Sequence, residues 1–163
     1  VPGGGGLGLG GLFSRARAGF TRRSDHQSQC RIEGALLDVA QSSARQSYRD
    51  LIEHPDFPLD GKSLDPAYLQ AHPDLAKKFS VCEETFGKLR DAVTGWTQKA
   101  RENPLMRKET ESRLDGVKSL FEEAQKTIPS ESFREKMEAM TKAIIEAFRR
   151  VFEKLGMSAS QPG

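Results

Sequence analysis

An unbroken heptad pattern in the middle of the sequence most limits what this chain can fold into. Eight apolar residues recur at alternating intervals of four and three: Leu75, Phe79, Cys82, Phe86, Leu89, Val93, Trp96 and Ala100. Residues spaced in this way share one face of an α-helix. Asn103-Pro104 follows, and proline does not fit the interior of a helix. The pattern therefore predicts a long helix that ends before this pair and buries one face.

Three other segments also have helical spacing. The first begins near Ser24 and ends before Pro55, and we expect its apolar residues to face the core: Ile32, Leu36, Val39, Ala40, Tyr48, Leu51 and Ile52. The second occupies residues 106–128, and the third runs from a Ser132-x-x-Glu135 capping box to a C-terminal cap at Gly156.

A short helix is expected at 66–71, because Asp65-Pro66 is typical of a helix start. No segment alternates between polar and apolar residues as a half-buried strand does. The predicted fold is therefore all-α: an antiparallel bundle of about four long helices plus one short helix.

The N-terminal region differs from the rest in glycine content and charge. Eight of the 15 glycines fall within the first 19 residues, and residues 1–31 carry a net charge of +4 against −2 for the remainder. Glycine loses the most backbone entropy on folding. We therefore expect a flexible Gly/Arg-rich linker over 1–24, a helical bundle domain over 25–156 and a disordered tail over 157–163. Because the chain begins Val1-Pro2, we interpret it as a fragment of a longer protein, with a processed N-terminus as the alternative.

The composition narrows the class of protein. No apolar run approaches the roughly 18 residues that a membrane span needs, and the leucines near the N-terminus are too dispersed for a secretory signal. Two cysteines cannot form a disulfide framework. We therefore expect a cytoplasmic protein without a membrane span.

The sequence offers no set of residues for catalysis. It contains neither a Gly-x-Ser-x-Gly elbow nor a phosphate loop, and its paired carboxylates fall on solvated helix faces. Among its histidines and cysteines, His26 and Cys30 alone have the spacing of metal ligands, and a frayed helix start explains them as well. We therefore predict no enzymatic activity, metal, cofactor or small-molecule substrate for this chain.

The last helix has a second apolar stripe beside its main one, formed by Thr141, Ile145, Phe148 and Phe152. A helix that is apolar on two sides is either central in its bundle or partly reserved for a partner. We predict a partner-binding surface at Ile145, Phe148, Arg149 and Phe152, with a central position as the alternative.

The arginines near the N-terminus suggest a second class of partner. Arg15, Arg17, Arg22 and Arg23 could bind the phosphates of a nucleic acid, and the nearby Phe13 and Phe20 suit stacking on single strands. The alternative is that this segment is only a solvated linker.

The general organisation resembles the non-catalytic C-terminal region of bacterial conjugative or mobilisation relaxases, which are plasmid-transfer proteins exported by type IV secretion. The resemblance is carried by the Gly-rich segment 3–11, the charged helical body 32–155 and the helical end 144–155 close to a polar terminus. It implies a docking or secretion-recruitment role. The tyrosine nucleophile and histidine cluster of that family are not present, so the resemblance assigns no catalytic residue.

Overall fold

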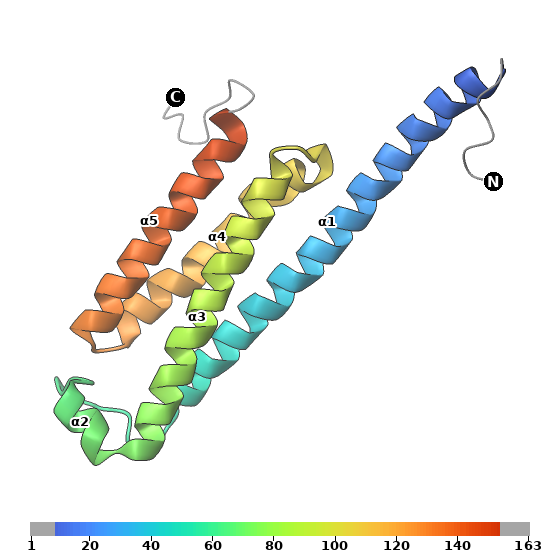
Figure 1. Ribbon diagram of the computed structural model, residues 1–163. Helices are drawn as coiled ribbons and strands as arrows, with labels where there is room; N and C mark the ends of the chain where they lie inside the picture. The colour runs from blue at the N-terminus through green and yellow to red at the C-terminus, as the bar shows by residue number, and fades with distance from the viewer. Residues whose placement is uncertain (1–8, 154–163) are drawn as a thin grey trace.

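The computed structural model describes the backbone of residues 9–153 and the side chains of residues 22–153. This part of the chain forms five helices: α1 (Leu9–Ile52), α2 (Pro66–Ala71), α3 (Pro73–Ala100), α4 (Pro104–Thr127) and α5 (Glu131–Glu153), shown in Figure 1. It contains no strand, so the predicted all-α class is confirmed. The expected cap at Gly156 and the expected tail 157–163 lie outside the described residues.

The four long helices run alternately up and down (Figure 1). α3 is the central element, since it packs on α1, α4 and α5 and also on the short helix α2. α4 packs on both α1 and α5, whereas α1 and α5 do not pack on each other. α2 covers the end of the bundle at which the chain passes from α1 to α3 (Figure 1).

Proline and short polar side chains determine where the internal helices begin. α2, α3 and α4 each have proline in the first turn, as predicted for α2. The Asp65 carboxylate accepts the Tyr68 N–H at 2.8 Å. The start of α5 differs from the predicted capping box, because Ser130 and not Ser132 accepts the Phe133 N–H, at 3.2 Å. Ser130 directly follows Pro129, which ends the preceding segment, so the helix starts two residues earlier than predicted.

The core follows the predicted heptad pattern of α3, all eight positions of which are buried. Phe86 contacts Phe121 of α4 and Phe133 of α5 edge to face, with ring centroids 5.2 and 6.1 Å apart. At the other end of α3, the indole Nε1–H of Trp96 donates to Thr110 Oγ1 at 2.9 Å. The three long helices α3, α4 and α5 therefore share one aromatic core.

α1 departs from the sequence-based expectation at its start. It begins at Leu9, and its N-terminal part extends past the turn between α3 and α4 (Figure 1). Residues 9–24, expected to be flexible linker, thus belong to the helix, and residues 1–8 lie outside the described part. The glycines of this segment carry an entropic cost in a helix, but that cost is small for each residue, about 1 kcal/mol relative to alanine.

The rotation of α1 also differs from the expectation over its middle. Tyr48 and Leu51 face the core as predicted, but Ile32, Leu36 and Val39 are exposed by 54%, 56% and 64%. Between residues 22 and 52 of α1, the buried positions are Gly34, Leu37, Ala44, Ser47, Tyr48 and Leu51. This buried face combines small residues with large ones such as Leu37, Tyr48 and Leu51. At Gly34 the end of the Arg113 side chain occupies the space of a larger residue, since a Cβ there would lie 2.6 Å from Arg113 Nη2.

Candidate interaction surface on helix α1

The exposed aliphatic residues of α1 form a continuous surface, here called the α1 stripe: Ile32, Leu36 and Val39. Their spacing of four and three aligns them along one side of the helix. The exposed residues next to the stripe are small: Ala35, Ser42 and Ser43. In the stripe, three large side chains therefore project from a helix face whose other residues are small.

Exposed aliphatic residues of this size are scarce elsewhere. Among residues 22–153, the other large apolar side chains that are comparably exposed are Leu59, in the loop after α1, and Val81 on α3. Scattered exposed apolar residues are normal on a soluble protein, whereas an aligned group marks a contact site. The α1 stripe is the aligned group in this part of the chain.

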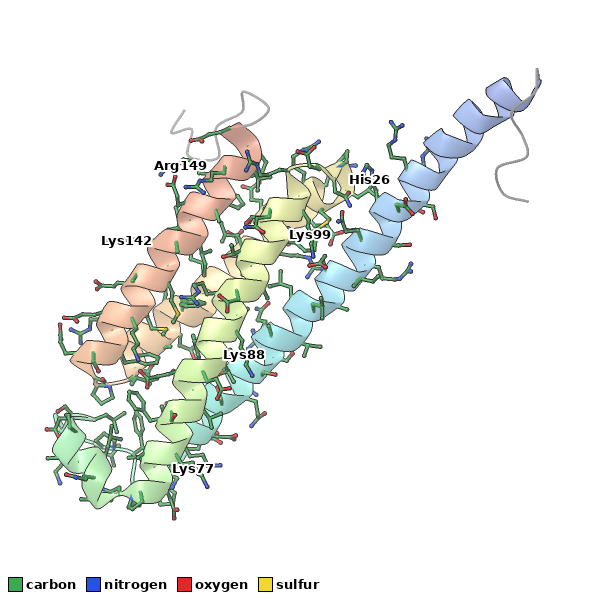
Figure 2. The ribbon with its side chains drawn as sticks, in the orientation of Figure 1. His26, Lys77, Lys88, Lys99, Lys142 and Arg149 are labelled. Carbon is green, nitrogen blue, oxygen red and sulfur yellow. The ribbon has the colours of Figure 1, made fainter. Side chains whose placement is uncertain are left out.

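Buried polar contacts fix the rotation of α1 and hence the direction of the stripe. Asn103, in the turn between α3 and α4, is fully buried, and its amide donates to the His26 carbonyl at 3.0 Å and to Gln29 Oε1 at 2.9 Å. His26 is labelled beside this turn in Figure 2. These bonds would break if α1 turned to bury the stripe, leaving buried polar groups unpaired.

Arginine and lysine side chains of the neighbouring helices hold α1 further along its length. Arg113 of α4 donates to Asp38 Oδ1 at 2.9 Å, and its guanidinium lies 4.7 Å from the Trp96 ring centre. Lys99 of α3 pairs with Glu33 at 2.7 Å (Figure 2). Two carboxylates of α1 are therefore already neutralised within the bundle.

The arginines of α1 whose side chains the structure describes have no such partners. Five of them are exposed, and none takes part in an ion pair with another residue in the range 22–153: Arg22, Arg23, Arg31, Arg45 and Arg49. Asp25 and Asp50 are also exposed, one beyond each end of the stripe. The surface around the stripe therefore carries an excess of unpaired positive charge.

The spacing of His26 and Cys30 suggested a pair of metal ligands, but in the structure Cys30 has a different partner. Its thiol donates to Glu109 Oε2 at 2.9 Å rather than pairing with His26. Burial, together with the adjacent Glu109 carboxylate, raises the pKa of Cys30 to about 11, so the sulfur stays protonated at neutral pH. Within the described residues, no group of three or more His, Cys, Asp and Glu side chains is arranged to hold a metal.

The predicted partner-binding residues of α5 lie together on its C-terminal half, but they are less accessible than the α1 stripe. Phe148 is buried at 8% exposure, with its ring centre 5.1 Å from that of the half-buried Phe152. Ile145 is half-buried, and Arg149, labelled in Figure 2, pairs with Glu146 at 3.5 Å. α5 packs on α3 and α4 at the edge of the bundle, so its second stripe covers the core without a central position.

The predicted nucleic-acid-binding residues all lie on α1. Arg22 and Arg23 are exposed, and Arg15 and Arg17 fall in the part of α1 for which the structure describes the backbone alone. Sequence reasoning missed the α1 stripe and the unpaired Arg45, whereas Arg31 lies at the end of the basic segment that it considered. The signal that could have revealed the stripe is a second heptad series on the same helix, offset from the buried one.

No helix in the described part of the chain is long and apolar enough to cross a membrane. Comparisons with protein-family models, curated proteins and solved structures give no match to this chain. A functional assignment therefore depends on the geometry of the bundle and its surface.

Proposed function

We propose that this chain is a non-catalytic protein-interaction module that docks its partner on the α1 stripe. One observation carries the proposal: Ile32, Leu36 and Val39 are each more than half exposed on a helix whose rotation is fixed by hydrogen bonds to Asn103 and Arg113. An exposed, aligned apolar group costs solubility unless something covers it. A docked partner supplies that cover.

The free energy available from the stripe is moderate. Full burial of one aliphatic side chain stabilises by about 1.5–3 kcal/mol, and about half of each stripe residue is still exposed. Covering the three residues therefore contributes about 3 kcal/mol, or roughly a hundredfold in affinity. This suits a reversible recruitment contact better than a permanent assembly.

The resemblance to relaxase C-terminal regions supplies a cellular setting for this proposal. In that setting the module acts in the cytoplasm and recruits a plasmid-transfer relaxase to a type IV secretion system. The genomic sequence that encodes this chain tests the setting directly, because a relaxase would carry a nicking domain in the same reading frame.

Site-specific photo-crosslinking tests the interaction surface. A benzoylphenylalanine at position 36 should yield discrete crosslinked protein in the native host cell. The same group at position 59 should yield none, because Leu59 is exposed by 71% but stands alone in a loop. Crosslinks from position 145 and not from 36 would assign the partner to α5. Equal yields from 36 and 59 would refute a defined surface.

A nucleic-acid-binding function is the second candidate, favoured by the unpaired arginines of α1. Arg22 and Arg23 continue along the helix into Arg31, Arg45 and Arg49, a distance of about 40 Å at 1.5 Å per residue. Electrophoretic mobility shifts with single- and double-stranded DNA at two salt concentrations test it. Replacing Arg15, Arg17, Arg22 and Arg23 with glutamine should abolish binding and flatten its salt dependence. Binding that survives this change would place the contact on the bundle.

A further inference from the structure

We infer that the α1 stripe takes an amphipathic helix with carboxylates along one edge of its apolar face. This inference rests on the proposed interaction function and names the chemistry of the partner. It follows from the shape of the stripe, the small residues beside it and the charges around it.

The shape of the stripe fits a helix laid along α1. Ile32, Leu36 and Val39 are anchors at i, i+4 and i+7, the pattern by which helices dock on one another, and they span about 10 Å of helix length. On one side the stripe is bordered by Ala35 and Ser42, both exposed. Small residues let a second backbone approach closely. The backbone of an incoming helix can therefore lie over this border while its apolar side chains pack against the stripe.

The charge beyond that border is positive. Arg31, Arg45 and Arg49 lie within about 40° of one another around α1, on the side toward α4. Of the acidic residues near this edge, Asp38 binds Arg113 at 2.9 Å, and the exposed Glu53 and Glu123 line a pocket together with Arg45 and Arg49. The long arginine side chains can extend across the small border residues, and a carboxylate on the incoming helix would satisfy them.

A second copy of this chain fits the same surface poorly. Consider two α1 helices that pack antiparallel with Leu36 of one copy against Val39 of the other. In this arrangement the numbers of any two residues that face each other add to 75. This register sets Asp25 against Asp50 and brings Arg31 level with Arg45, so like charges meet at both places. In a parallel pair with the two helices in register, each charged residue lies beside the same residue of the other copy, so like charges again meet. Three stripe residues also bury far less than the roughly 800 Å² per partner of a stable dimer.

Two synthetic helical peptides of about three heptads test the chemistry. They share one leucine and isoleucine stripe, and the positions beside it carry glutamate in the first peptide and lysine in the second. Fluorescence anisotropy with the full chain should show the glutamate peptide binding at least about tenfold tighter than the lysine peptide, with a preference that shrinks as salt rises.

Matched variants connect that preference to the surface. Leu36→Ser should weaken both peptides, whereas Leu59→Ser, at a more exposed but isolated leucine, should weaken neither. Arg31→Gln with Arg45→Gln should lower the affinity for the glutamate peptide alone. Circular dichroism should show the same helix content for all variants.

Three results would overturn the inference. Equal binding of the two peptides, or no effect of the arginine changes, removes the charge argument. A dimer in sedimentation equilibrium that Leu36→Ser dissolves assigns the stripe to a second copy. If residue 36 crosslinks specifically but one of these results is obtained, the interaction function stands. The acidic helix as its partner is then refuted. Failure of the crosslinking itself rejects the interaction function.

Discussion

Two neighbouring leucines of α1 should respond very differently to the same substitution. Leu37 is 2% exposed and Leu36 is 56% exposed. Leu37→Ala removes a core side chain and leaves a cavity, which costs about 2–5 kcal/mol. Leu36→Ala removes a side chain that is less than half buried. Since full burial of leucine is worth about 1.5–3 kcal/mol, this change should cost about 1 kcal/mol or less.

The comparison isolates burial, because both variants exchange leucine for alanine in the same helix and so share one change in helix propensity. We expect the free energies of unfolding to differ by about 1–4 kcal/mol, or roughly 5- to 1,000-fold in the unfolding equilibrium. Urea unfolding followed by circular dichroism measures this, with equal slopes required for a fair comparison. Equal losses, or a larger loss for Leu36→Ala, would mean that α1 is rotated as its aliphatic pattern alone predicts.

Three further substitutions test other contacts. Thr110→Val should cost about 1–3 kcal/mol in urea unfolding, because the buried Trp96 Nε1–H loses its acceptor, while Thr110→Ser should cost less. Asn103→Asp keeps the oxygen that caps α4 but removes the amide donor to α1, so amide exchange should quicken in the adjoining turns of α1 and stay slow at the start of α4. Glu109→Gln should lower the pKa of Cys30 from about 11 and so speed its alkylation by iodoacetamide at pH 8, since the thiolate is the reactive form; an unchanged rate would show that burial alone protects the thiol.

The sequence predicts α3 well because packing and composition agree there. Every position of its heptad series is apolar, from Leu75 to Ala100, and the helix is surrounded by other elements. A central helix needs a wide apolar face, so the residues that are apolar are also the residues that are buried. The same agreement holds for most of α4.

α1 is harder to predict because its buried series contains Gly34 and the half-buried Gln41. Both occur where α4 approaches closely: a Cβ at Gly116 would lie 3.1 Å from the Gln41 amide nitrogen. A hydrophobic pattern gives no weight to such positions and selects the larger Ile32 and Leu36 instead. The sequence pattern therefore places the candidate surface in the core, since composition cannot distinguish aliphatic residues that face the bundle from those that face a partner.

The up-and-down order of the helices also affects how fast the chain can fold. Each long helix lies antiparallel to the next long helix along the chain (Figure 1), so many tertiary contacts close only short stretches of sequence. Proteins rich in such local contacts fold within microseconds to milliseconds. The α1–α3 and α4–α5 hairpins can each form before they dock through the α3–α4, α1–α4 and α3–α5 contacts. The nascent chain therefore exposes its apolar faces only briefly, which limits the time available for aggregation.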